Sequence, residues 1–163
     1  MSFRLAPMCR LMWVLTVVVL ALLLMFLVGA ALWTRMLFVP AFLILVICVW
    51  VWTRFRPTAF VVHPRALEVV WPLKRRELER GTITGVRLMT AKELRQEIGW
   101  GVRVGAGGLW GGFGWLWTTR RGIVQMYISR IDRFVWIERM SERPWLITPD
   151  RPEAFVRALS ARS

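Results

Sequence analysis

The chain has 163 residues, a formal net charge of +13 and a hydrophobic content of 56%. Its two cysteines, Cys9 and Cys48, both precede the more polar part of the chain, which excludes a disulfide framework and a thiolate zinc site there. A single histidine, His63, excludes a Cys–His pair and a multi-histidine metal site. We therefore expect no enzymatic activity, no cofactor and no metal.

Two apolar runs, residues 11–33 and 37–51, stand back to back near the N-terminus, with Arg35 between them. About 20 helical residues cross the roughly 30 Å hydrocarbon core of a bilayer. The first run is long enough to cross the bilayer. The second run is long enough when its flanking residues are included. We predict that residues 1–56 form a transmembrane helical hairpin and residues 57–163 one compact domain.

Basic residues flank this hairpin unequally. Arg4 and Arg10 precede the first run, Arg54 and Arg56 follow the second, and Arg35 stands alone in the turn. The positive-inside rule therefore places both termini in the cytoplasm, as in a multi-pass protein of the inner membrane. Tryptophans are expected at the interfaces, with Trp13, Trp50 and Trp52 on the cytoplasmic side and Trp33 on the other.

A cleaved signal peptide is the alternative for the first run, which ends in the small residues 29–31. Secretory apolar segments have about 7–15 residues, fewer than this run, and here a second run follows directly. The hairpin is therefore the preferred interpretation.

The positive charge lies almost entirely after the hairpin, where all but three of the 23 Lys and Arg residues are found. A basic domain of this kind binds nucleic acid, an anionic surface or an acidic partner. Beside an anionic leaflet each Lys or Arg gains roughly 1 kcal/mol. We expect anionic lipid headgroups, a membrane-protein partner or a second copy of the chain, and we do not expect nucleic acid.

The segment after Pro57 alternates between apolar and polar residues. Residues 58–63 and 66–71 are rich in β-formers and predict a β-hairpin, and residues 82–89 predict a third strand. The charged segment 74–80 between them is expected to be a solvated loop or an edge.

The second half of the domain shows further short periodic segments. Residues 91–98 fit either a helical turn or an edge strand, and the pattern leaves this open. Strands are predicted at residues 123–130, 134–138 and 144–148, and their spacing of about ten residues suggests a meander.

The C-terminal segment predicts a helix of about ten residues. Asp150 is suited to the N-cap, Pro152 to the first turn, and Glu153 stands three residues after Asp150. Phe155 and Leu159 share one face. The overall pattern is therefore a mainly-β domain, a strongly bent sheet or partial barrel of about seven antiparallel strands capped by a C-terminal helix.

Four segments in this order carry a resemblance to a known family. They are RVGAGGLWGGFG at 103–114, VQMY at 124–127, FVWI at 134–137 and ITPDRPEAF at 147–155. Together they resemble the bacterial pleckstrin-homology-like (PH-like) domains of membrane-anchored proteins, over residues 58–159. The resemblance implies a seven-stranded PH-like barrel with a C-terminal helix, and it implies no catalytic residue and no ligand.

The glycine-rich segment 99–114 is the strongest candidate for a functional surface. It lacks the Gly-Lys-Ser or Gly-Lys-Thr of a phosphate loop and the third glycine of a dinucleotide fingerprint. A flexible loop with aromatic tips suits contact with a membrane or a partner, whereas glycines that permit bends beside core aromatics would be structural. The predicted surface comprises Arg103, Gly105, Gly107, Gly108, Trp110, Phe113, Arg120 and Arg121, with Trp100, Trp115 and Trp117 nearby.

Two basic groups, at residues 74–76 and 120–121, are either headgroup contacts or an ordinary solvated face. Our leading hypothesis is a non-enzymatic, membrane-anchored interaction or scaffold module at the cytoplasmic face that binds a protein partner or an anionic lipid surface. The alternative is a structural accessory subunit of a larger membrane complex, which packs through its transmembrane hairpin.

Overall fold

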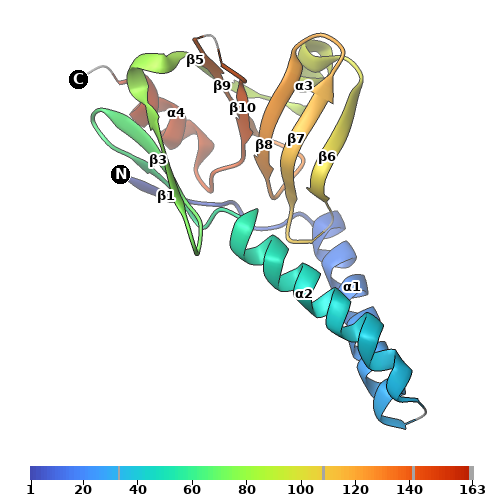
Figure 1. Cartoon of the computed structure of the whole chain (residues 1–163). Helices are drawn as coiled ribbons and strands as arrows, with labels where there is room; N and C mark the ends of the chain where they lie inside the picture. The colour runs from blue at the N-terminus through green and yellow to red at the C-terminus, as the bar shows by residue number, and fades with distance from the viewer. Residues whose placement is uncertain (33, 108, 141, 162–163) are drawn as a thin grey trace.

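The computed structural model describes residues 1–32, 34–107, 109–140 and 142–161 (Figure 1). Two long helices, α1 (Arg10–Leu32) and α2 (Phe38–Arg54), extend together from a β-rich domain, and the short 3-10 helix η1 (Arg35–Leu37) joins them. Both helical segments are long and apolar enough to cross a membrane. The predicted pair of apolar helices is confirmed, and Trp33, expected at the far interface, lies outside the described residues.

Most large apolar side chains on the two helices are exposed, including Leu24 and Met25 on α1 and Phe42 and Leu43 on α2. Such surfaces are unfavourable in water and suited to lipid. The buried side chains of the helices are Met12, Thr16, Ala30, Ala41, Cys48 and Val51.

The first sheet has four antiparallel strands in the order β1-β2-β3-β4. Its strands are β1 (Ser2–Arg4), β2 (Ala59–Val62), β3 (Ala66–Val70) and β4 (Arg75–Glu79). The predicted β-hairpin is formed by β2 and β3. The charged segment 74–80 forms β4, an edge strand, so the edge alternative is the correct one. Residues 2–4, which precede the helical hairpin in the sequence, pair with β2 and therefore belong to this sheet.

The second sheet has six strands in the order β5-β9-β10-β8-β7-β6. Its strands are β5 (Ile83–Met89), β6 (Gly101–Gly107), β7 (Gly112–Thr118), β8 (Gly122–Ile128), β9 (Phe134–Arg139) and β10 (Trp145–Ile147). The predicted meander is wrong, because β10 inserts between β8 and β9 and pairs parallel to β8.

Residues 91–98, left open between helix and strand, form helix α3 (Ala91–Ile98). Thr90 and Glu93 make a capping box at its start, since the Thr90 hydroxyl accepts from the Glu93 amide and the Glu93 carboxylate accepts from the Thr90 amide (2.7 Å). Leu94 and Ile98 pack against the second sheet together with Met12 of α1. The helix therefore covers the outer face of that sheet.

The main core lies between the two sheets. It contains Phe60, Leu67 and Val69 of the first sheet and Trp145 and Ile147 of the second, all fully buried. At the β5 side the core is closed by helix α4 (Pro152–Ser160).

Helix α4 buries Phe155 edge-on against Phe3, with ring centroids 5.2 Å apart. Leu159 is also buried in the same core, as predicted. The N-cap is Arg151, one residue later than the predicted Asp150, since the Arg151 carbonyl accepts the first helical bond, from the Phe155 amide (2.9 Å). The Asp150 carboxylate accepts from the neighbouring Arg151 amide (2.9 Å). The expected bent β domain with a C-terminal helix is thus confirmed.

Arg80 binds the C-terminal end of α4. Its guanidinium donates to the carbonyls of Leu159 (2.6 Å) and Ala161 (2.7 Å), which have no partner within the helix. We expect Arg80→Met to lower the free energy of unfolding by about 1–2 kcal/mol and to speed hydrogen–deuterium exchange in α4. Arg157→Met, on the exposed face of α4, is the control. Equal exchange in both variants would contradict this role for Arg80.

Candidate interaction surface

The glycine-rich segment is a paired β-hairpin and not a flexible loop. β6 and β7 pair along their whole length, from Gly101 opposite Thr118 to Gly107 opposite Gly112. Gly105 and Gly114 face each other with φ of 139° and 126°. A Cβ on Gly105 would overlap the Phe113 carbonyl, so these two glycines allow the strands to approach closely.

The turn of this hairpin contacts the chain's own helices. The Trp110 amide donates to the Thr16 hydroxyl of α1 (3.0 Å), and the Trp110 ring lies edge-on to Trp52 of α2 at 4.9 Å. Phe113 is fully buried in the core between the sheets. Trp110 therefore fastens the domain to its helical hairpin, and Phe113 has no exposed surface for a partner.

The remaining predicted site residues do not form one surface with Trp110. Arg103 lies opposite Leu116, which packs on the outer face of the sheet. Gly107 ends β6 near the helices, and Gly108 lies outside the described residues. Arg120 and Arg121 lie in the β7–β8 turn, at the other end of β7 and about 20 Å from its start at 3.4 Å per residue.

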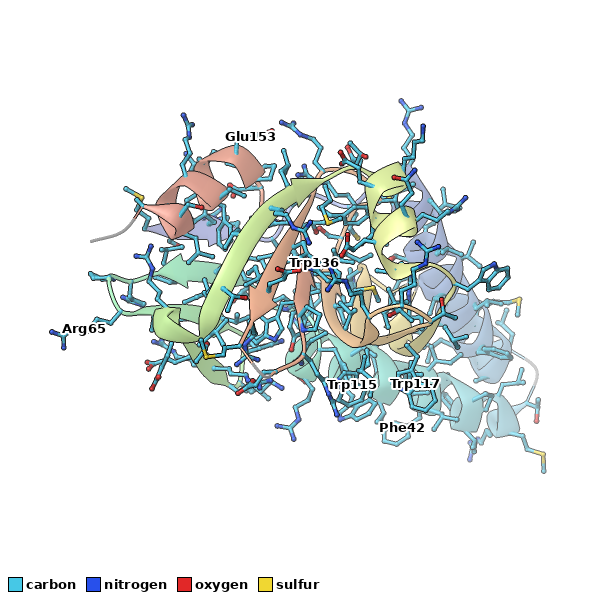
Figure 2. All side chains as sticks on the ribbon, turned by 90° about the horizontal axis from the view of Figure 1, so that it is seen from above. Phe42, Arg65, Trp115, Trp117, Trp136 and Glu153 are labelled. Atoms are coloured by element: carbon cyan, nitrogen blue, oxygen red, sulfur yellow. The ribbon has the colours of Figure 1, made fainter. Side chains whose placement is uncertain are left out.

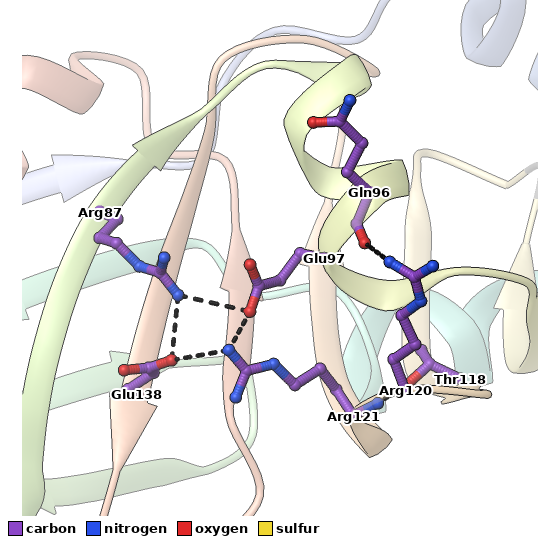
Figure 3. Close-up of polar contacts among 7 residues, drawn as sticks. All are labelled: Arg87, Gln96, Glu97, Thr118, Arg120, Arg121 and Glu138. Carbon is purple, nitrogen blue, oxygen red and sulfur yellow. Dashed lines mark hydrogen bonds and ion pairs between the residues drawn. The ribbon is translucent and has the colours of Figure 1, made fainter.

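Arg120 and Arg121 hold helix α3 against the sheet (Figure 3). Arg120 donates to the Gln96 carbonyl (2.7 Å). Arg121 pairs with Glu97 and lies 3.4 Å from Glu138. Arg87 of β5 completes this network, at 3.0 Å from Glu138 and 3.6 Å from Glu97. These arginines are thus already engaged within the domain.

A different set of residues on the same hairpin is exposed. Val102 opposes Trp117 and Val104 opposes Trp115, so the four side chains share one face of the β6–β7 ladder. Each is between 41% and 63% exposed. We call these four residues the tryptophan face; Figure 2 shows Trp115 and Trp117 side by side. β6 is also the free edge of its sheet.

A basic cleft borders the tryptophan face, between the edge strand β4 and strands β7 and β8. It has a volume of about 690 Å³, and Trp115 belongs to both surfaces. We call it the arginine cleft. Its lining includes Arg76, Arg121, Arg139 and Arg143, with Gln125 and Glu142.

The arginines of this cleft are held in place by neighbouring rings and polar groups. Arg76 donates to Gln125 (3.3 Å), and Arg76 and Arg139 both lie over the Trp145 ring, at 5.5 and 5.4 Å. The Arg139 side chain is only 5% exposed and pairs with Glu142. Burial lowers the pKa of the Arg139 guanidinium, but from so high a value that it stays charged at neutral pH.

Tyr127 holds the side chain of Gln125, one of the residues that line the cleft. Gln125, which receives the Arg76 bond, donates its amide to the Tyr127 hydroxyl (2.6 Å). Burial raises the pKa of Tyr127 to about 12, so its hydroxyl is neutral at physiological pH.

Glycine and tryptophan content singled out the segment that forms the β6–β7 hairpin but did not select Val102 and Val104 of its exposed face. Val102, Val104, Trp115 and Trp117 alternate with other residues, which is the signal of one strand face. Phe113 shares that face, and its burial depends on how the two sheets pack, which the sequence does not show. Arg139 and Arg143 had no such signal, because their proximity to Arg76 depends on how the two sheets pack.

Other chemistry-bearing groups are engaged in surface pairs. His63 lies 3.1 Å from Glu68, and Arg75 lies 3.3 Å from the same carboxylate. In the part of the chain that the structure describes, no group of three or more His, Cys, Asp or Glu side chains is arranged to hold a metal ion.

The close pairing of Gly105 and Gly114 gives a stability prediction. Gly105→Ala forces a side chain into a positive-φ position and against the Phe113 carbonyl, and we expect a loss of about 1–3 kcal/mol in unfolding free energy. Gly81→Ala is the matched control, because a Cβ there meets no atom within 4 Å. Thermal unfolding in detergent micelles measures both. Similar melting temperatures for the two variants would contradict the structural role of the glycine pair.

The network in Figure 3 gives a pH prediction. The hydrogen bond from Arg121 holds the pKa of Glu97 below its ordinary value of 4.5. The ionised carboxylate therefore stabilises the fold above that pH, and the stabilisation is lost as the pH falls through the lowered pKa. We expect Glu97→Gln to be less stable than the parent at pH 6 and to approach it near pH 3, in urea denaturation. A gap between the two proteins that is constant with pH would contradict this.

Residues 58–163 match the family model described as Bacterial PH domain. No curated protein and no solved structure matches the chain. The matched segment runs from the residue before β2 to beyond α4 and includes both the tryptophan face and the arginine cleft. The chain therefore belongs to the bacterial PH domain family.

Proposed function

We propose that the chain is a membrane-anchored, non-enzymatic interaction module that binds a protein partner through the tryptophan face. A PH domain is in general an interaction module for proteins or lipids, and this assignment of partner and surface is our own. The anchor is the helical hairpin, and the positive-inside rule favours the cytoplasmic side for the domain.

The observation that carries the proposal is the exposure of the tryptophan face. Soluble surfaces rarely leave neighbouring large apolar side chains uncovered unless they bind something. Tryptophan is enriched among residues that dominate binding energy at protein interfaces. The free edge of β6 adds unpaired backbone groups beside the face, which an extended segment of a partner can pair with.

The position of the face favours a protein over the lipid bilayer. The turn at Trp110 contacts Thr16, within the second turn of α1, and so marks the level at which the domain meets the helices. Trp115 and Trp117 stand about 10 and 17 Å further along β7. If the helices span a membrane, both rings lie above the hydrocarbon core and are available to a protein beside the anchor.

Photocrosslinking in cells tests this assignment. A photoreactive amino acid at position 104 should yield a discrete crosslinked protein, and the combined change Trp115→Ser and Trp117→Ser should lower its yield at least tenfold. Trp100→Ser is the matched control, because Trp100 is 84% exposed but borders the groove beneath α3. We expect Trp100→Ser to leave the yield unchanged.

A probe at Phe42, on the exposed surface of α2, tests the alternative that the hairpin itself is the binding element. A discrete crosslink from position 42 that is insensitive to the Trp115 and Trp117 changes, with none from position 104, would replace our proposal by that alternative.

A further inference from the structure

The positive charge of the arginine cleft is not balanced within the domain. In the described part of the chain, neither Arg76 nor Arg143 has a carboxylate partner. Arg139 forms an ion pair with Glu142. Arg121 also lines the cleft, but Glu97 and Glu138 engage its guanidinium. Arg76, Arg139 and Arg143 therefore face one carboxylate.

Two of these guanidinium groups are fixed before any ligand arrives. Arg76 and Arg139 stack on the same buried ring, Trp145, and like charges held this close repel each other. The buried Nε of Arg139 has no hydrogen-bond partner. Because that atom is buried, the donors that a ligand can reach are those of the exposed Arg76 and Arg143. Planar guanidinium groups match carboxylate or phosphate oxygens, so the cleft suits an anionic group.

The location of the cleft indicates which kind of molecule carries that group. Arg121 lies in the β7–β8 turn and Arg143 in the β9–β10 connection, at the ends of these strands remote from the Trp110 turn. Arg76, however, follows the β3–β4 turn, where the Trp71 indole donates to the Phe55 carbonyl just after α2 (3.1 Å), so the cleft runs from near the helices to this remote end. Trp115 joins the cleft directly to the tryptophan face, and this continuity favours a protein segment that occupies both surfaces.

We infer that the arginine cleft binds carboxylate side chains of an acidic segment in a protein partner, whose adjoining apolar side chains lie on the tryptophan face. This inference rests on the proposed function, since it names the chemistry of the partner that the face would bind. The ligand is thus an extended peptide segment with Asp or Glu residues next to bulky apolar ones.

Selection from a random dodecapeptide display library, with the full chain in nanodiscs as bait, tests the inference. We expect recovered peptides to be enriched in Asp or Glu beside apolar residues. The combined change Arg76→Gln and Arg143→Gln should abolish the acidic enrichment and keep the apolar one. Arg65→Gln, at the opposite end of the domain in Figure 2, should change neither.

Affinities of one selected peptide make the test quantitative. Fluorescence anisotropy should show at least tenfold weaker binding when its Asp and Glu residues become Asn and Gln, and the same loss when Arg76 and Arg143 are both changed to Gln. Higher salt should weaken the parent pair, because the contact is between charges. Circular dichroism checks that the variants, altered only at exposed positions, remain folded.

The possible outcomes separate this inference from the function on which it rests. Apolar enrichment without acidic enrichment overturns the role of the cleft and leaves the tryptophan face in place. No enrichment at all, or enrichment unaffected by changing Trp115 and Trp117 to Ser, overturns the proposed function as well. Capture of vesicles containing 30% phosphatidylserine, or tight binding of inorganic phosphate, that depends on Arg76 and Arg143 would assign the cleft to a phosphate source instead of a protein.

Discussion

The backbone pairing of β1 with β2 is the interaction on which the arrangement of the molecule depends. The two strands lie on opposite sides of the helical hairpin in sequence, yet they pair in register. The chain then crosses to the second sheet, where the Ala6 amide donates to the Thr148 carbonyl (2.9 Å) and the Cys9 amide to the Ser129 carbonyl (3.1 Å), just before α1 begins. Hydrogen bonds therefore fix both ends of the hairpin to the domain, and the domain does not turn freely on one linker.

This attachment determines which surfaces of the domain remain available. The Trp110 turn adds a second contact with the helices, and this contact fixes the turn end of the β6–β7 hairpin against α1 and α2. Helix α3 covers the outer face of the second sheet, and α4 closes the core at the β5 side. The face of β6 and β7 that carries Phe113 extends beyond the first sheet, so the tryptophan face on it stays uncovered. An exposed apolar edge is a hazard for aggregation, and its retention here is reasonable if a partner covers it.

Sequence periodicity was sufficient for most elements and insufficient for their order. Apolar length located the two helices, alternation located β2, β3, β5, β8, β9 and β10, and Pro152 with Phe155 located the terminal helix. The glycines of segment 99–114 hid the strands β6 and β7. The pairing of Ser2–Arg4 was not predictable, because three residues carry too little pattern to indicate a strand whose partner lies beyond the hairpin. The insertion of β10 parallel to β8 was missed for a related reason, since spacing between strands does not determine which strands become neighbours.

The candidate site shows why composition identifies a segment more readily than its working residues. Glycine and tryptophan content pointed to the β6–β7 hairpin, but Phe113 and Trp115 lie two residues apart on the same face of β7, the first buried in the core and the second exposed. Only the packing of the two sheets determines which of them is covered. Charge shows the same division. Arg121 is neutralised by carboxylates from α3 and β9, whereas no carboxylate of the described residues pairs with Arg76 or Arg143. Much of the basic character of the sequence thus serves internal attachment, whereas in the described part of the chain Arg76 and Arg143 of the arginine cleft keep no carboxylate partner and lie beside the exposed Trp115, where an acidic segment of a protein partner can bind them.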